Sequence, residues 1–461
     1  MDSRQPCPAS VLRTTGHLGR RAFLGRAASV ALGGAAAQGC AFEQAEPVGE
    51  ARAGEANQNP DADLTSWDGV RAQFPDSDLI QMSALFIASH PRLVGDAIAA
   101  YRDELDQDPV GTLETHNAAR RDEVRQAAAQ YLGAEAEEIA LTDSTTMGLG
   151  LVYGALPLRE GDEILTTEQD YYVTHEALRL AASRTGARVR RLPLYEDISD
   201  VSAADLASRI VREIGGNTRV LALTWVHSST GLRLPIEAIG QAVRSINEHR
   251  PEQRRLLFCV DAVHGFGIEP VTVNDIGCDF FVAGCHKWLF GPRGTGLVWG
   301  KPASWDGLHA VIPTFADDDV WAAWMRGEEP KGPTTAARMT PGGFKAFEHQ
   351  WAMTMAFAFH ERVGPERVRA RTHELNRALK EGLRAMPHVR LVTPMPDDMS
   401  AGIVCFDVEN VSPWDAVAHL RRHRVVGTVT PYAVRHVRLT PSIRNSHGEM
   451  DRVLSAIHSL T

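Results

Sequence analysis

Residues 279–296 read Asp-Phe-Phe-Val-Ala-Gly-Cys-His-Lys-Trp-Leu-Phe-Gly-Pro-Arg-Gly-Thr-Gly. The apolar run from Phe280 to Ala283 predicts a buried strand, which ends at Gly284 shortly before Lys287 and a Gly/Pro-rich turn. Burial disfavours an ammonium group, so a lysine at the mouth of a sheet tends to have a depressed pKa and is suited to forming a Schiff base. Taken alone, Lys287 is equally compatible with a strand-end lysine that extends to water.

Strands and helices alternate on both sides of this stretch, from about residue 136 to residue 300. Seven short, mostly apolar runs predict strands: Glu138–Thr142, Glu163–Thr167, Ala187–Pro193, Arg219–Trp225, Leu256–Val260, Phe280–Ala283 and Gly296–Trp299. Four helical patterns lie between them: Thr146–Leu156, Thr174–Thr185, Ala203–Ile214 and Ile236–Glu248. The alternation predicts an α/β fold with a mainly parallel seven-stranded sheet, whose ligand site lies outside the carboxyl ends of the strands.

The C-terminal part of the chain has a different pattern. Long helical stretches over Phe344–Arg362 and Pro365–Ala385 are followed by shorter strands and helices. We therefore expect a large domain over residues 76–345 and a smaller α+β domain over residues 346–461.

Four groups of complementary chemistry fall at predicted strand ends. Thr142–Gly148 offers hydroxyls and free N–H groups at a helix N-terminus, which suits a phosphate. Asp261 places a carboxylate where a protonated ring nitrogen would be its partner. Tyr171 and Tyr172 offer a ring face for stacking, and Lys287 is the Schiff-base candidate. Together these groups describe a pyridoxal phosphate (PLP) site.

With these motifs, residues 76–460 resemble the class V aminotransferase-fold PLP enzymes of fold type I. The similarity is to the isopenicillin-N-epimerase-like and cysteine-desulfurase-like branch. The motifs that carry it are Thr142–Thr146, Glu168–Tyr172, Ser228–Gly231 with Pro235, Asp261–His264, His286–Leu289, Gly291–Gly296, Thr340–Phe344 and Val437–Thr440.

The resemblance implies roles around the cofactor. Lys287 would carry it and move the proton at Cα, Asp261 would pair with the ring nitrogen, and His264 would lie near the ring or its phenolic oxygen. Tyr171, or its neighbour Tyr172, would stack on the ring. The remaining implied contacts are Thr145, Thr146 and His286 to the phosphate, Ser228 or Ser229 to the other side of the ring, and Thr340 to the phosphate of a neighbouring subunit in a homodimer.

The resemblance also implies a substrate site. Arg438 would hold the substrate α-carboxylate with its planar guanidinium. Arg435 and Arg444 lie nearby in sequence, and any of the three is equally suited to a structural ion pair. His90 occupies the segment that approaches the substrate in this family. His264 has a simpler alternative, that of a hydrogen-bonded, partly buried histidine.

The positions of the cysteines bear on whether the chain could act as a cysteine desulfurase. Desulfurases of this branch carry a nucleophilic cysteine shortly before the carboxylate-binding arginine, but residues 427–435 contain none. Cys405 belongs to an earlier predicted strand, where we expect it to be buried. Persulfide chemistry is therefore not expected, and no cysteine pair has metal-ligand spacing.

The N-terminus resembles an export signal. Arg20 and Arg21 precede a small-residue apolar run, Ala27 to Ala37, as in a twin-arginine signal peptide over residues 1–40. The alternative is a basic, disordered N-terminus. Cys40 resembles a lipoprotein cleavage site, although the usual Leu three residues earlier is missing. The composition of residues 41–75 predicts a linker and N-terminal arm. The signal predicts a periplasmic or extracytoplasmic location, and lipidation at Cys40 would make the protein a membrane-anchored lipoprotein.

The formal net charge of −10 argues against a nucleic-acid partner. We expect a small-molecule amino acid or peptide-like substrate, and an exported enzyme that acts at Cα as an aminotransferase or epimerase. The alternatives are a PLP-dependent C–S lyase and an exported binding protein that keeps the fold without catalysis.

Overall fold

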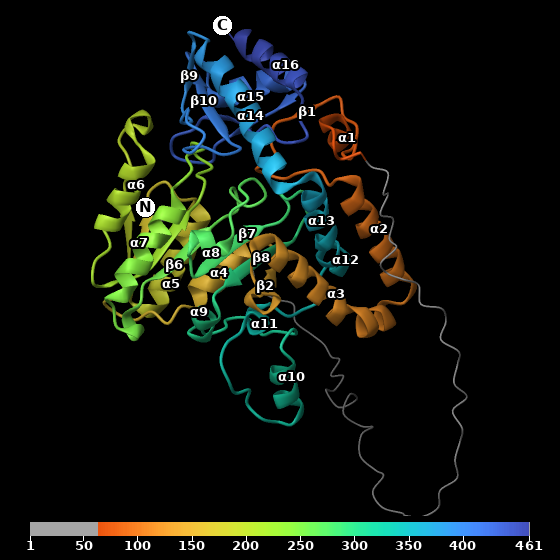
Figure 1. The fold of residues 1–461 in the computed structure, drawn as a ribbon, viewed down its shortest axis with the longest axis vertical. Helices are drawn as coiled ribbons and strands as arrows, with labels where there is room; N and C mark the ends of the chain where they lie inside the picture. The colour runs from red at the N-terminus through yellow and green to blue at the C-terminus, as the bar shows by residue number, and fades with distance from the viewer. Residues whose placement is uncertain (1–62, 461) are drawn as a thin grey trace, which may run out of the picture. The chain divides into compact units, whose positions relative to one another are not determined.

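The computed structural model describes residues 63–460 (Figure 1). A seven-stranded sheet has the order β2-β8-β7-β6-β5-β3-β4, in which only β8 runs antiparallel to its neighbours. All seven predicted strands are present, which confirms the predicted fold class. Their bounds are β2 (Ile139–Thr142), β3 (Glu163–Thr167), β4 (Arg188–Leu192), β5 (Thr218–Thr224), β6 (Leu257–Asp261), β7 (Phe280–Gly284) and β8 (Gly296–Gly300).

The two faces of this sheet are covered by different helices, because successive strand side chains point to opposite faces. In β5, Leu221 and Leu223 belong to the core beneath one set of helices, whereas Val220 and Ala222 belong to the other core. The first set comprises α2 (Arg92–Gln107), α3 (Pro109–Leu132), α6 (Ala203–Arg212), α7 (Ile236–Glu248), α8 (Val273–Ile276), α12 (Phe347–Trp351) and α13 (Met353–Val363). The second comprises α4 (Thr145–Ala155), α5 (Tyr172–Thr185), α9 (Pro302–Asp306) and α11 (Ala336–Met339).

The C-terminal part forms its own core around a four-stranded antiparallel sheet of order β12-β13-β10-β9. Figure 1 shows this part in blue, gathered at one end of the described chain. Its elements are α14 (Pro365–Arg384), β9 (Val389–Leu391), β10 (Val404–Val408), α15 (Pro413–Arg422), β11 (Val425–Val426), β12 (Thr428–Val429), β13 (Val437–Leu439) and α16 (His447–His458). The remaining α-helices and β-strand are α1 (Trp67–Arg71), β1 (Ile80–Gln81) and α10 (Asp318–Met325).

Two segments pack against the other domain from the one to which the sequence analysis assigned them. The short strand β1, grouped with the large domain by sequence, pairs in parallel with β11 of the C-terminal part. Helices α12 and α13, grouped with the small domain, pack against α2 and α3 instead. A two-residue strand has no periodicity to detect, and helix packing partners are not encoded in the helical period itself.

The predicted twin-arginine signal and Cys40 lie outside the described residues. Across residues 63–460, every helix is too short or too polar to cross a membrane.

Candidate active site

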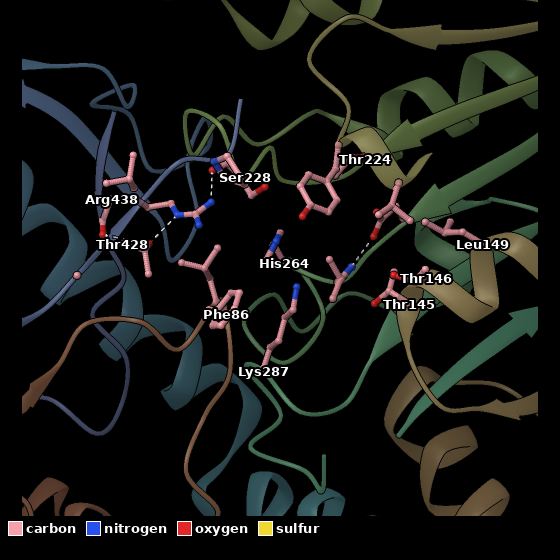
Figure 2. Close-up of a pocket in the computed structure, with 18 of the residues that line it drawn as sticks. Phe86, Thr145, Thr146, Leu149, Thr224, Ser228, His264, Lys287, Thr428 and Arg438 are labelled. Atoms are coloured by element: carbon pink, nitrogen blue, oxygen red, sulfur yellow. Dashed lines mark hydrogen bonds between the residues drawn. The ribbon is translucent and has the colours of Figure 1, made fainter. Parts of the chain in front are cut away.

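Parallel strand pairing brings the candidate groups to one edge of the sheet. In the registers of β5, β6 and β7, Thr224 lies beside Asp261, and Asp261 lies beside Val282. Since β7 ends at Gly284, the chain turns at the same edge and places Lys287 there. A cavity of about 510 Å³ opens at this edge, and both Asp261 and Lys287 line it (Figure 2).

Burial shifts the proton affinities of these two groups in opposite directions. Desolvation raises the pKa of the Asp261 carboxyl, although the Val263 N–H, 3.2 Å from Oδ1, and Lys287 oppose the shift. Desolvation lowers the pKa of Lys287, and Arg438 adds to the effect while Asp261 opposes it. A lysine with a depressed pKa is a free amine for a larger part of the time, which is what covalent attachment to a carbonyl requires.

His264 lies on the same cavity wall and is held by a tryptophan. The Nε1–H group of Trp288 donates to Nδ1 of His264 across 3.3 Å. Burial lowers the pKa of His264 well below its usual value, and the nearby cations, Lys287 first, act in the same direction. The ring is therefore neutral with its proton on Nε2.

The start of α4 provides an anion cradle. Ser144 caps the helix by accepting from the Met147 N–H, which leaves the first N–H groups free for a ligand. The buried Thr145 Oγ1 and His286 Nδ1 atoms have no hydrogen-bond partner among the described residues. A Cβ at Gly284 would lie 3.0 Å from Thr145 Oγ1 and from the His286 ring, so a glycine is needed for this close approach. Two unpartnered polar atoms close to the start of a helix fit a phosphate.

Of the two tyrosines predicted as ring-stacking candidates, one lines the cavity. Tyr171 lines the cavity as the N-cap residue of α5, whereas Tyr172 is 61% exposed. The Tyr171 ring packs edge-on against Tyr432, with 5.8 Å between centroids. Ser228 also lines the cavity, and its Oγ lies 2.7 Å from the Tyr432 hydroxyl. Ser229 is buried and does not reach the cavity.

Arg438 is the one of the three candidate arginines that faces the cavity. It is 3% exposed, and its Nε donates to Thr428 Oγ1 at 3.0 Å while Nη1 donates to the Ser228 carbonyl at 2.7 Å. Arg435 is exposed, and Arg444 is bound to Ser89 instead. Figure 2 shows Arg438 across the cavity from Thr145 and Thr146, which line its opposite side.

Besides Ser229, the predicted site residues His90, His286 and Thr340 do not line this cavity. His90 lies in a separate pocket of about 350 Å³ with Arg92 and Arg293, which corrects the expectation that it approaches the substrate site. Thr340 is buried, and its hydroxyl accepts from the Leu141 N–H at 3.2 Å and donates to the Ala336 carbonyl at 3.0 Å. Its contact with a neighbouring subunit stays a prediction.

Sequence reasoning missed several residues that shape the cavity. Thr428 and Tyr432 hold Arg438 and Ser228, and Phe86 and Trp414 form part of the opening. Thr428 could have been found only from its cross-strand pairing with Arg438 in β12 and β13. Phe86 and Trp414 have no sequence signal, because they come from segments far from the predicted strand ends.

Comparison with known proteins places this geometry in a family. The class-V aminotransferase family model matches residues 88–430. The chain is 26% identical over 415 residues to the isopenicillin N epimerase of Streptomyces clavuligerus, covering 86% of this chain and 99% of that protein. It is 24% identical over 426 residues to a probable cysteine desulfurase of Vibrio cholerae, covering 86% and 98%.

Solved structures show the same fold. A mutant of C-DES with glycine covalently linked to its PLP cofactor superposes with a TM-score of 0.76 at 21% identity, covering 85% of this chain and 99% of that chain. A cysteine desulfurase from Thermococcus onnurineus superposes with a TM-score of 0.73 at 21% identity, covering 85% and 97%. The chain therefore belongs to the class-V aminotransferase family of PLP-dependent enzymes, which confirms the predictions of fold, cofactor and enzyme class.

Proposed function

We propose that this protein is an exported enzyme that acts at the Cα of an amino acid, or of an aminoacyl group in a larger metabolite, as an aminotransferase or epimerase. The observation that carries the proposal is one cavity lined by both the Lys287 amine and the Arg438 guanidinium (Figure 2). An α-carboxylate held by Arg438 would leave the α-amino group and Cα directed towards Lys287.

Each residue has a task in this proposal. Bound PLP draws electrons from Cα and so acidifies its proton. Asp261 would hold the ring nitrogen, and Thr145, Thr146 and His286 would hold the phosphate. Lys287 would take or return the Cα proton, since its depressed pKa allows it to act as a base near neutral pH.

The cysteines argue against persulfide chemistry. All four cysteines within residues 63–460 are buried, and none lines the cavity. Burial raises the pKa of Cys405 to about 12, which keeps it a thiol. Tyr432, in the loop where a desulfurase would carry its nucleophile, cannot replace a thiolate. The relatives named as desulfurases thus belong to the same family without implying the same reaction here. The remaining alternative to an aminotransferase or epimerase is a C–S lyase that needs no thiol.

The test is the absorption spectrum of the purified protein with PLP, alone and with a panel of L- and D-amino acids. We expect a visible band that is lost in Lys287→Ala and that changes with particular amines. Release of a 2-oxo acid that keeps the whole substrate side chain supports transamination, and solvent deuterium at Cα without that release supports epimerisation. Release of reduced sulfur from a thiol substrate supports the lyase. A Lys287→Ala protein with full turnover would refute the proposal.

Export rests on Arg20 and Arg21, which lie outside the described residues. Replacing both with lysine is expected to retain the protein in the cytoplasm of the producing cell, as measured by fractionation. Labelling with a radioactive fatty acid would test lipidation at Cys40, with Cys40→Ser as the control. Secretion that is unaffected by the arginine replacements would contradict the signal.

A homodimer is supported by exposed aromatic side chains in the segment around α10. Phe315 is 67% exposed and Phe344 is 86% exposed, and their rings lie 6.4 Å apart. Large apolar side chains exposed together mark interaction surfaces. Light scattering on the purified protein should give twice the mass of one chain, and a single-chain mass would contradict the homodimer.

A further inference from the structure

The cavity has two chemically different walls. The wall at the sheet edge is mainly polar, because it holds the groups assigned to the cofactor beside the apolar Leu149, Val173 and Val263. The opposite wall is formed by residues 82–88 and by the C-terminal part. Beside Thr428 and Arg438 it holds six apolar residues: Leu85, Phe86, Trp414, Val417, Val429 and Pro431. We refer to these six residues as the apolar wall.

The apolar wall is built next to the carboxylate clamp. Val429 follows Thr428, which accepts the hydrogen bond from Arg438 Nε. Trp414 and Val417 are three residues apart in α15 and therefore share one helix face. A substrate whose carboxylate is bound by Arg438 would have its side chain beside these residues.

The segment that contains Leu85 and Phe86 is hydrogen-bonded to the segment that contains Lys287. The Ala88 N–H donates to the His286 carbonyl at 3.1 Å, and the Thr440 N–H donates to the Met82 carbonyl at 2.9 Å. These two bonds hold the segment that contains Leu85 and Phe86 between Lys287 and β13. The apolar wall thus lines the same cavity as Lys287 and Arg438, and Figure 2 labels Phe86 of this wall together with these two residues.

The charge and exposure of the lining residues indicate which substrate side chains the apolar wall would bind. Phe86 is 67% exposed and Trp414 is 63% exposed, although both are large and apolar. Among the described residues that line the cavity, Asp261 is the sole acid, and it lies on the opposite, polar wall. A charged side chain would lose water here without gaining a partner, whereas an apolar one would cover two aromatic faces.

We propose that the substrate carries a large apolar side chain, aromatic or branched, that binds against Phe86 and Trp414. The inference rests on the proposed function, because it takes Arg438 as the carboxylate site. The substrates would then be α-amino acids or aminoacyl groups with a bulky uncharged side chain.

The experiment is a spectral titration of the PLP-loaded protein with amino acids of one configuration and different side chains. Phenylalanine, tryptophan and leucine are expected to bind at least about ten-fold more tightly than alanine, aspartate and lysine, because burial of a large apolar group has that effect on affinity. Trp414→Ala and Phe86→Ala should each reduce this preference several-fold, because affinity for phenylalanine, tryptophan and leucine falls more than affinity for alanine. Trp414→Phe should keep most of the preference for bulky apolar amino acids.

The control is Leu180→Ala, which removes a 42% exposed apolar side chain from α5 outside the cavity. This variant should retain the preference. Equal affinities across the panel, or a preference that survives both Trp414→Ala and Phe86→Ala, would overturn the inference while leaving the proposed function standing. A change of molecular mass in these two variants, with the preference intact, would instead identify the wall as a subunit contact. A spectrum that responds to no amine would refute the proposed function itself.

Discussion

The indole N–H of Trp288 donates to Nδ1 of His264, and both side chains are buried beside Lys287. Trp288 follows Lys287 directly in sequence, so the turn that places the lysine also sets the tautomer of the histidine. The histidine keeps its Nε2–H as a donor, because Nδ1 is occupied as an acceptor.

Trp288→Phe removes this donor and leaves a buried acceptor unpaired. We expect the free energy of unfolding to fall by about 1–3 kcal/mol, measured by urea denaturation. The absorption of bound PLP should also shift, since the ring of His264 can then adopt the other tautomer. The matched control is Trp305→Phe, whose indole N–H donates to the Glu138 carbonyl at 3.0 Å away from the cavity. An unchanged cofactor spectrum in Trp288→Phe would contradict the role of the pair.

Thr145→Val removes a buried hydroxyl that has no partner within the described chain. The cofactor-free protein should therefore lose little stability, while PLP affinity should fall by about ten-fold for a hydrogen bond to a charged phosphate. Fluorescence titration with PLP and thermal unfolding measure the two effects. Thr340→Val should instead lower the free energy of unfolding of the cofactor-free protein, because its hydroxyl has two partners in its own chain. A loss of PLP affinity in Thr340→Val would support the predicted contact between subunits.

Arg438→Gln removes the predicted carboxylate clamp. A charge-assisted bond contributes about 1.5–3 kcal/mol, so we expect amino-acid affinity to fall by at least about ten-fold. PLP binding should persist, which separates this effect from a loss of the cofactor site. Arg435→Gln, at an exposed position, serves as the control and should bind amino acids normally. Equal affinity in the two variants would assign the carboxylate to another group.

The rate of covalent attachment of PLP should depend on pH through Lys287. Only the free amine reacts, so the rate rises with pH and levels out near the lysine pKa, which burial holds well below that of an ordinary lysine. Arg438→Gln should move this plateau to higher pH, because Arg438 lowers the pKa of Lys287. Asp261→Asn should move it to lower pH, because Asp261 raises that pKa. Stopped-flow absorbance measures the rate, and shifts in the same direction for both variants would contradict this electrostatic arrangement.

Much of the fold follows from local patterns in the sequence. Short apolar runs separated by helical periods predict parallel strands, and parallel strands have their carboxyl ends at one edge. Asp261 and Lys287 each follow an apolar run, so their placement at the same edge could be deduced without coordinates. Ser144 could likewise be recognised as the cap of α4, because capping depends on neighbouring residues in the chain.

Tertiary structure decided what depends on packing between distant segments. Tyr171 and Tyr172 are adjacent and chemically alike, and only the docking of α5 determines that Tyr171 lines the cavity. Arg438 is distinguished from its neighbours by the cross-strand partner Thr428 and by the approach of the Ser228 carbonyl. The apolar wall arises where residues 82–88 meet the C-terminal part, and contacts between such distant segments leave no periodic signal. The sequence by itself determined which chemistry the sheet edge presents, and the packing of the two parts of the chain decided which side chains face it.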